Sequence, residues 1–577
     1  MAFPSFLKGV FKSKNTDEIV IPAAKQKARN AEGFYRMTCP YCLEQFDVWE
    51  MPFRAQSISA VAASPSVSAD AGRKRHSGYG QSVERAAAPA QPDADSLRYF
   101  PVEEDKKLKQ FTEHVKAKGR SYVLGKVLTL YEPDSEGGAF NGQGIQAVKL
   151  RDQKEWIPIT LNAPDLLYHK AIVRVRDIYN NESAVRLCPH CHNVMSNDVC
   201  LYPNYTIMFM GNTNCGKTVY KIRLLYEMSK EGLLNRHYSL NRISTGNKVD
   251  GLEVTSIDDL YEQTFGSAHR GESEGIAPIT QIQYIDPITF PLLQNGQTSA
   301  LITFYDFPGE AIWKRRDDPE YGWFLAQIEK RINELDGIIF LLDTSTVNNI
   351  RNALPENFIF SQKGTKEEQS RKTPAQVLGQ FQQNFITAEM ENIIPLPICY
   401  TFSKCDLLAK VIRDVRNDGS IAPGLAHVVS DLMEPPVCVT NWEEQGLHEL
   451  RQSKCANETF DPTHWEWERN AYIRNRQARH TRVDMENILR SHEELQSLFS
   501  HETGAVMSVS PKGLLFALSA VGVPIKKDEA IPEVPPIRLT EPLEYLMWQM
   551  GLAEHDAETL VSDDDKRTLC RLRTGRQ

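Results

Sequence analysis

One stretch, Tyr205–Val219, constrains this chain more than any other. It begins with an apolar run and continues into a turn that follows the spacing G-x-x-x-x-G-K-[ST] from Gly211 to Thr218. A helical pattern of apolar residues follows over 219–228. The sequence therefore predicts a strand, a glycine loop (Gly211–Thr218) and a helix in direct succession.

The residue types of the glycine loop suit a phosphate chain. Glycine lets bare backbone N–H groups converge on an anion, and the helix N-terminus adds positive charge. Lys217 is expected to reach the outer phosphates, and the Thr218 hydroxyl to ligate Mg²⁺. A chance match in a turn is the competing interpretation, but the flanking strand and helix argue against it. The expected nucleotide contacts here are Gly211, Asn214, Cys215, Gly216, Lys217, Thr218 and Val219.

Composition narrows the class of protein. The chain has 577 residues, of which 41% are hydrophobic and 24% charged, as in soluble proteins with several domains. The net charge of -9 argues against broad nucleic-acid binding. No apolar run reaches the roughly 18 to 20 residues that span a bilayer. Eleven cysteines, an odd number, favour reduced thiols and a cytoplasmic location.

Four cysteines form two Cys-Pro-x-Cys pairs that lie far apart in the chain: Cys39 with Cys42, and Cys188 with Cys191. Each pair can present two thiolates to one ion, and Zn²⁺ takes four ligands in tetrahedral geometry. Four thiolates leave no open position on the metal. We therefore expect one Zn²⁺ that stabilises the fold and does not catalyse.

A shared zinc site requires the two pairs to fold together as the knuckles of a zinc ribbon. The ribbon would cover residues 37–53 and 185–200. The sequence leaves other arrangements open: a redox-active pair, two separate sites, or ligation by His190, His192 or Cys200.

The other N-terminal segments differ in pattern. In residues 1–36, apolar side chains over 3–11 share one helical face, which suits peripheral membrane contact, a protein partner or packing on the chain itself. Residues 54–94 are rich in Ala, Ser, Pro and Gly, and we expect a disordered linker. Residues 95–184 alternate β-like runs with turns, which predicts a small β-rich module inserted into the ribbon.

Acidic residues follow the next β-like runs. Runs over 281–293 and 299–305, joined by an Asn-Gly turn, predict a hairpin that leads into Asp306. An acidic residue at this strand tip can hold Mg²⁺ through water, and Gly309 can offer its N–H to a γ-phosphate. The apolar run that ends in Asp343 predicts another strand followed by a helix cap.

Two further strand ends carry groups that suit guanine. The run 396–402 leads into Ser403–Asp406. A carboxylate at Asp406 can accept hydrogen bonds from guanine N1–H and the 2-amino group, while the Lys404 stem lies along the purine. The run 514–518 leads into Ser519-Ala520, where a backbone N–H can meet guanine O6.

In this order the motifs resemble those of Ras-like GTPases of the translation-factor-related class. Gly211–Thr218 looks like the first motif, Asp306–Gly309 the third, Ser403–Asp406 the fourth and Ser519-Ala520 the fifth. The resemblance implies an α/β P-loop GTPase domain that binds GTP or GDP and Mg²⁺. It also implies a mostly parallel six-stranded sheet with one antiparallel hairpin.

The resemblance assigns catalytic positions beside Lys217. Thr280 is our choice for the threonine that meets Mg²⁺ and the γ-phosphate, with Thr255 and Thr264 as alternatives. Glu310 stands where the family places a water-orienting glutamine. Its charge would repel the γ-phosphate, so we expect slow hydrolysis.

Other positions depart from the family pattern. Ser403 stands where the fourth motif usually has Asn or Thr. No arginine finger can be assigned within the chain, because each candidate also suits a solvated surface. These candidates are Arg270, Arg315 and Arg316.

The resemblance implies a domain plan for the C-terminal part. The GTPase domain would cover 201–406 and 507–555, with a helical insertion at 407–506 and a charged tail at 556–577. A Cys₄ knuckle ahead of such a domain resembles, more narrowly, the bacterial double-GTPase group. That group is associated with conflict or defence systems.

The resulting hypothesis is a guanine-nucleotide switch that hydrolyses GTP slowly with Mg²⁺ and signals to protein partners, either an effector or an activating protein. Two alternatives belong to other classes. One is a non-hydrolysing scaffold stabilised by GTP, and the other is a zinc-ribbon nucleic-acid binder regulated by a GTPase.

Overall fold

The structure is a computed structural model, and it describes the following residues: 36–47, 50–54, 106–114, 130–131, 146–147, 175–176, 182–183, 186–196, 199, 202–234, 236–240, 257–266, 269–270, 287–314, 318, 322–332, 335–353, 372–385, 394–408, 482–522, 525, 536–555 and 563–574. The chain divides into two compact units, Arg29–Tyr202 and Met1–Ala28 with Pro203–Gln577.

Several predictions from the sequence fall outside the described residues. They concern the amphipathic segment 3–11, nearly all of the linker 54–94, most of the β-rich module 95–184 and most of the insertion 407–506. The residues Cys200, Thr255, Thr280, Arg315 and Arg316 are outside them as well.

In the unit Arg29–Tyr202, the described residues form short antiparallel strands and one helix. Strand β1 (Arg36–Thr38) pairs with β2 (Gln45–Asp47), β3 (Phe53–Arg54) with β4 (Leu130–Tyr131), and β6 (Val175–Arg176) with both β5 (Gln146–Ala147) and β7 (Glu182–Ser183). The helix is α2 (Lys106–His114).

The unit with Pro203–Gln577 is built on a seven-stranded sheet of order β14-β13-β12-β8-β11-β10-β9. The strands are β8 (Asn204–Gly211), β9 (Tyr238–Ser239), β10 (Ile288–Gln294), β11 (Gln297–Asp306), β12 (Gly337–Asp343), β13 (Ile398–Ser403) and β14 (Gly513–Ala517). Strand β10 pairs antiparallel with β11 and with β9, and the other neighbouring pairs of this sheet are parallel. The mixed α/β fold and the mostly parallel sheet are confirmed, but the sheet has seven strands where we expected six.

The seventh strand, β9, extends the hairpin edge of the sheet. Ser239 pairs with Leu293, and Tyr238 with Gln294. Two residues are too few to show an alternating pattern, so this strand could not be predicted from the sequence.

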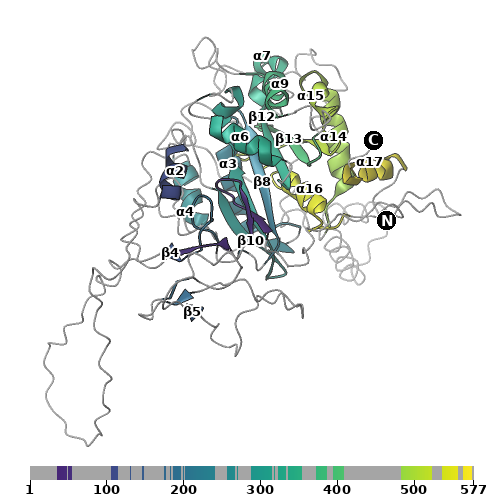
Figure 1. Cartoon of the computed structure of the whole chain (residues 1–577). Helices are drawn as coiled ribbons and strands as arrows, with labels where there is room; N and C mark the ends of the chain where they lie inside the picture. The colour runs from purple at the N-terminus through teal and green to yellow at the C-terminus, as the bar shows by residue number, and fades with distance from the viewer. Residues whose placement is uncertain are drawn as a thin grey trace, which may run out of the picture. The chain divides into compact units, whose positions relative to one another are not determined.

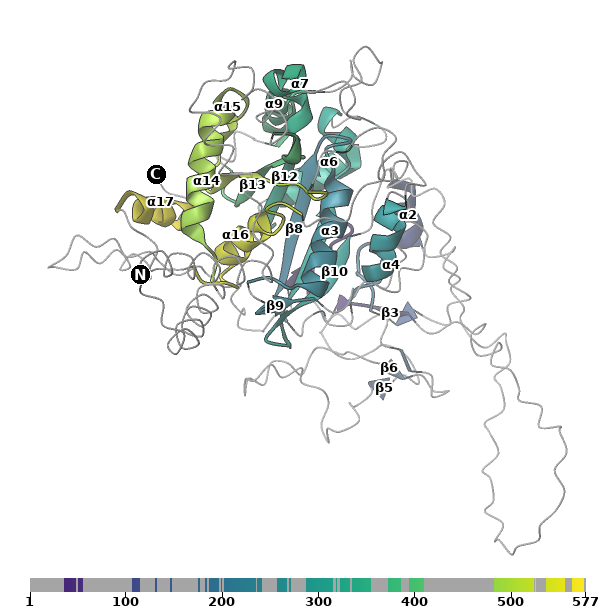
Figure 2. The same cartoon turned by 180° about the vertical axis from the view of Figure 1, so that it is seen from behind.

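Helices cover both faces of the sheet, with α3 and α16 on one face and α6 and α9 on the other (Figures 1 and 2). Their bounds, with those of the other helices of this unit, are α3 (Lys217–Lys230), α4 (Ile257–Tyr261), α6 (Gly322–Arg331), α7 (Asn348–Ala353), α9 (Pro374–Phe385), α14 (Met485–Leu498), α15 (Ser500–Met507), α16 (Glu541–Met550) and α17 (Asp563–Thr574). None of the helices in the described part of the chain has the length and apolar content to cross a membrane.

The central strands are apolar on both sides, as expected for parallel strands between two helical layers. Ile207 and Phe209 of β8 belong to a core cluster that includes Trp548 of α16. Phe340 of β12 contacts Phe381 of α9, with ring centroids 5.0 Å apart. Strand alternation thus directs neighbouring apolar residues into two separate layers.

The C-terminal part differs from the expected secondary structure. The last described part of the helical insertion expected over 407–506 forms two helices, α14 and α15, which are separated at Phe499. The Phe499 ring stacks on Phe402, with ring centroids 3.8 Å apart. The segment expected to be a charged tail contains α17, where Leu569 and Leu572 are buried.

Candidate functional site

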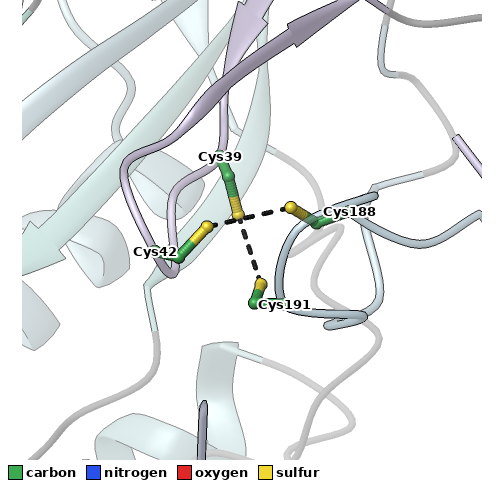
Figure 3. Close-up of side chains that lie close together, drawn as sticks. All are labelled: Cys39, Cys42, Cys188 and Cys191. Atoms are coloured by element: carbon green, nitrogen blue, oxygen red, sulfur yellow. Dashed lines mark hydrogen bonds between the residues drawn. The ribbon is translucent and has the colours of Figure 1, made fainter. Parts of the chain in front are cut away.

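The structure brings the two Cys-Pro-x-Cys pairs together (Figure 3). The Sγ atoms of Cys39 and Cys191 are 3.7 Å apart, and those of Cys42 and Cys188 are 3.8 Å apart. A tetrahedral Zn²⁺ with Zn–S bonds of about 2.3 Å requires sulfur atoms about 3.8 Å from one another. The four cysteines therefore have the spacing of a single tetrahedral metal site.

The backbone of each pair forms the same turn. Leu43 and His192, which follow the second cysteines, have positive φ values of 57° and 55°. The N–H of Tyr41 donates to Cys39 Sγ, and the N–H of His190 donates to Cys188 Sγ, both at 3.4 Å. Such N–H···S bonds stabilise thiolates, so both turns are built to present charged sulfur to a cation.

The surroundings of the sulfur atoms also fit a metal ion. Burial raises the pKa of Cys39 and of Cys188, because a thiolate without a counter-charge is poorly solvated there. Asn193 Nδ2 donates to Cys191 Sγ at 3.1 Å, as an outer-shell partner would. His190 Nε2 lies 3.1 Å from the Gln45 carbonyl oxygen, which gives this ring a partner outside the cluster.

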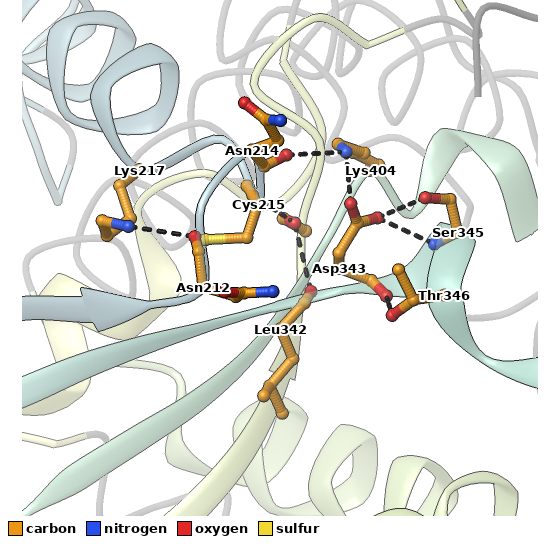
Figure 4. A network of polar contacts seen from close by, with 10 residues as sticks. Asn212, Asn214, Cys215, Lys217, Leu342, Asp343, Ser345, Thr346 and Lys404 are labelled. Atoms are coloured by element: carbon orange, nitrogen blue, oxygen red, sulfur yellow. Dashed lines mark hydrogen bonds and ion pairs between the residues drawn. The ribbon is translucent and has the colours of Figure 1, made fainter. Parts of the chain in front are cut away.

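In the other unit, the glycine loop connects β8 to α3. Asn214 has φ of 64°, and Gly216, the N-cap of α3, has φ of 90°. A Cβ at Gly211 would lie 2.4 Å from the Leu341 carbonyl oxygen, so only glycine fits there. The Lys217 ammonium group donates to the Gly211 carbonyl oxygen at 2.9 Å and to the Asn212 carbonyl oxygen at 3.0 Å, the second of which is drawn in Figure 4. Lys217 thus folds back over the loop.

The segment after β11 lies directly on the glycine loop. A Cβ at Gly309 would be 2.6 Å from the backbone N of Thr213, an approach that excludes any side chain. Gly309 begins a 3₁₀ helix, η5 (Gly309–Trp313), which includes the backbone of Glu310. Trp313 Nε1 donates to Asn212 Oδ1 at 3.0 Å. The expected first and third motifs are therefore in direct contact.

The end of β13 is joined to the same loop. Ser403 Oγ donates to the Cys215 carbonyl oxygen at 2.7 Å and also lies 3.1 Å from that of Leu342. Lys404, at φ of 59°, donates to the Asn214 carbonyl oxygen at 3.0 Å. The expected fourth motif thus holds the backbone of the first through two side chains.

Lys404 has a second partner, at the end of β12. Its ammonium group is 2.6 Å from Asp343 Oδ2, and both side chains are mostly buried. Asp343 also accepts from the N–H and hydroxyl of Ser345, and caps a short 3₁₀ helix, as the sequence predicted (Figure 4). Its salt bridge with Lys404 was not predicted.

Asp406 lies beside the expected fifth motif. Burial raises the pKa of Asp406, while a hydrogen bond with the Ser519 side chain and the charge of Lys404 act in the opposite direction. The Ser519 N–H donates to the Ile537 carbonyl oxygen at 3.0 Å. The backbone N–H of Ser519, one of the two expected base contacts, is thus bonded within the protein.

Asp306, the expected Mg²⁺ residue, has a partner that the sequence did not reveal. Lys221 of α3 places its Nζ 2.9 Å from Asp306 Oδ2, and each side chain is 2% exposed. A carboxylate that is paired with a buried ammonium group does not fit a role reserved for a metal ion. The expected Mg²⁺ residue therefore already has a positively charged partner.

Three residues singled out from the sequence make other contacts in the structure. Thr264, an alternative for the second motif, is buried in a π-helical turn, and its hydroxyl donates to the Leu260 carbonyl oxygen at 2.9 Å. Arg270, a candidate arginine finger, forms a salt bridge with Glu262. Val219, in the first turn of α3, packs against the core cluster.

A cavity of about 270 Å³ opens beside the glycine loop. Its walls include residues 212–214 of the loop, Asp343 at the end of β12, and the side chains of Trp313 and Lys372. The Lys372 ammonium group lies 5.6 Å from the centre of the Trp313 ring. Lys372 thus brings a positive charge to the edge of the loop, which the sequence alone did not single out.

No protein-family model and no curated protein sequence matches the chain. Among solved structures, the chain is similar to the S. cerevisiae Ski7 GTPase-like domain bound to GDP and inorganic phosphate, with 14% identity and a TM-score of 0.15. That match covers 38% of this chain and 39% of the Ski7 chain. The same domain bound to GTP gives 14% identity, a TM-score of 0.15 and 38% coverage of each chain. The chain spans less than half of either structure.

Proposed function

We propose that the unit with Pro203–Gln577 is a guanine-nucleotide switch whose phosphates bind at the glycine loop. The observation that carries this proposal is the contact between Ser403–Lys404 and the loop backbone. Residues some 190 positions apart meet at the carboxyl edge of a parallel sheet, which is where such folds bind ligands. A loop that matched the motif by chance would have no reason to form hydrogen bonds with Ser403 and Lys404, which are so distant in the chain.

The preference for guanine rests on Asp406. Its carboxylate lies next to Ser519 and close to Lys404, whose Nζ contacts the loop at Asn214. A carboxylate in this place accepts hydrogen bonds from the N1–H and the 2-amino group of guanine. Adenine has no hydrogen on N1 and no 2-amino group, so it offers neither donor. Guanine is therefore the base that this position recognises.

We further propose slow hydrolysis that depends on a protein partner. Gly309 contacts the loop and can respond to a third phosphate, and Glu310 follows it in η5. A carboxylate orients water poorly beside a negatively charged phosphate. Unassisted turnover is then expected near the slow end for this chemistry, on the order of 10⁻⁴ to 10⁻² per second.

Nucleotide binding can be tested by titrating the full chain with fluorescent mant-GDP and, separately, mant-ADP. Guanine binding with at least about a hundredfold preference over adenine supports the proposal, since two lost hydrogen bonds to a charged group cost several kcal/mol. Lys217→Ala should abolish binding. Lys230→Ala, which removes an exposed lysine at the other end of α3, is the matched control. Absence of guanine-nucleotide binding would contradict the proposal.

A single-turnover experiment distinguishes a switch from a GTP-stabilised scaffold. Purified protein loaded with GTP is sampled over hours, and the nucleotide is separated and quantified. Slow conversion to GDP supports a switch. Intact GTP after many hours would favour the scaffold instead.

A further inference from the structure

The buried salt bridge between Lys221 and Asp306 places a positive charge beside the carboxylate that was expected to hold Mg²⁺. Lys221 lies one helical turn after Lys217 on α3, and Asp306 ends β11. We propose that Lys221 takes the place of the metal ion at Asp306, so that the site binds guanine nucleotides without requiring Mg²⁺. This inference rests on the proposed function, because it concerns the same nucleotide site.

The salt bridge neutralises the one charge that the expected metal ligands contribute. The Lys221 ammonium group is 2.9 Å from Asp306 Oδ2, and the protein shields both side chains from water. At this distance and burial, the two charges cancel for any third ion nearby. The other expected protein ligands, the Thr218 hydroxyl and the second-motif threonine for which Thr280 is our choice, are neutral. Mg²⁺ gives up its water reluctantly and is held by protein carboxylates together with substrate phosphates. With Asp306 neutralised, the protein side adds no net charge to the attraction of the phosphates for the ion.

The positions of both partners are set by the fold. The register of β11 and β8 pairs Asp306 with Phe209, and the N–H of Phe307 donates to the Phe209 carbonyl oxygen at 2.9 Å. Lys221 is held on the inner face of α3 among buried apolar residues. Separation of the pair would leave a buried charge without a partner, which is strongly unfavourable. The salt bridge is therefore a fixed part of the site.

Lys221 also removes a reason to need the metal. An ionised Asp306 without a partner would repel the phosphates of a bound nucleotide, and in that case Mg²⁺ would be required to shield it. With Lys221 in place, the phosphates meet the Lys217 ammonium group, the loop amides and the N-terminus of α3 without an opposing charge.

The test compares mant-GDP affinity of the full chain in a magnesium buffer and in EDTA. For the natural sequence we expect the two dissociation constants to agree within about threefold, since the site is already neutral. For Lys221→Met we expect the EDTA value to rise relative to the magnesium value by at least about tenfold. Lys230→Met is the matched control, because Lys230 forms an exposed salt bridge with Asp258 on the same helix. It should leave the ratio unchanged.

A double variant, Lys221→Met with Asp306→Asn, guards against misfolding of the single variant. It removes both buried charges together, so its ratio should match that of the natural sequence. A ratio above about threefold for the natural sequence would show that nucleotide binding requires the metal ion and would overturn this inference alone. A fall of that ratio in the double variant would assign the metal ion to Asp306. Absence of mant-GDP binding in both buffers would overturn the proposed function and this inference with it.

Discussion

The Ser403 hydroxyl donates to the Cys215 carbonyl oxygen at 2.7 Å, and so ties the end of β13 to the glycine loop. Ser403→Ala leaves that buried acceptor without this donor, at a cost of about 1 to 2 kcal/mol. Because this bond holds the glycine loop in the conformation proposed to bind the phosphates, we expect the cost to appear as a roughly 5- to 30-fold fall in guanine-nucleotide affinity. Isothermal titration calorimetry measures the change.

Ser403→Thr is the control for this prediction, because it keeps the hydroxyl group. Threonine is also one of the residues that the resembled family uses at this position. Its affinity should stay close to that of the natural sequence. Equal losses in the two variants would mean that side-chain volume, and not the hydrogen bond, sets the affinity.

Asp406→Asn should change the base preference from guanine to xanthine. An amide can donate to the xanthine oxygen at the position where the carboxylate accepts from the guanine amino group. We expect GDP affinity to fall by at least about a hundredfold and xanthosine diphosphate affinity to rise. Competition against mant-GDP measures both. Asp258→Asn, at an exposed site on α4, should change neither. Unchanged GDP affinity in Asp406→Asn would exclude this residue as the base reader.

Trp313 should report nucleotide binding by its fluorescence. Its Nε1 donates to Asn212 of the glycine loop, so rearrangement of the loop changes the surroundings of the indole. We expect GDP to change the tryptophan emission, and Trp313→Phe to lose most of that change. The variant keeps seven of the eight tryptophans, so any change in emission that remains on GDP binding comes from these seven. A full signal in Trp313→Phe would mean that another tryptophan senses the ligand.

The chain should contain one Zn²⁺ held by the four clustered cysteines. Cys39→Ser should reduce the zinc content from one ion per chain to near zero, because a three-thiolate site binds more weakly. Metal analysis by mass spectrometry after gel filtration gives the stoichiometry. Cys570→Ser, in α17 outside the cluster, is the control and should retain the ion. Equal zinc content in both variants would place the metal elsewhere.

His492 should make the protein sensitive to acid. Burial, helped by the charge of Arg571, lowers the pKa of His492 from 6.5 to about 4, and its Nδ1 accepts from the Leu515 N–H at 3.1 Å. The unfolded chain therefore binds a proton more readily than the folded one. The free energy of unfolding therefore decreases by roughly 3 kcal/mol in total as the pH falls from 6.5 towards 4.

Urea unfolding at a series of pH values measures this slope. His492→Gln should flatten the part of the curve between pH 6.5 and pH 4. His501→Gln, at an exposed position of α15, should leave the curve unchanged. An unaltered slope in His492→Gln would assign the acid sensitivity to other groups.

The sequence predicted features that depend on neighbours in the chain. The glycine loop has a fixed spacing, the central strands are continuous apolar runs, and Asp343 caps the helix turn that follows it. The four cysteines could be assigned to one cluster because a Cys-x-x-Cys turn needs a second pair to complete a tetrahedral site.

Only the tertiary structure decided which charged side chains meet. Lys221 and Asp306 are separated by 85 positions, and Lys404 and Asp343 by 61, so no local pattern connects them. A lysine on an amphipathic helix shows the same pattern whether its ammonium group lies in water or against a carboxylate. The register of β8 with β11 and the face that α3 turns to the sheet determine the outcome, because they bring a positive group to the strand end where the sequence indicated a metal ion.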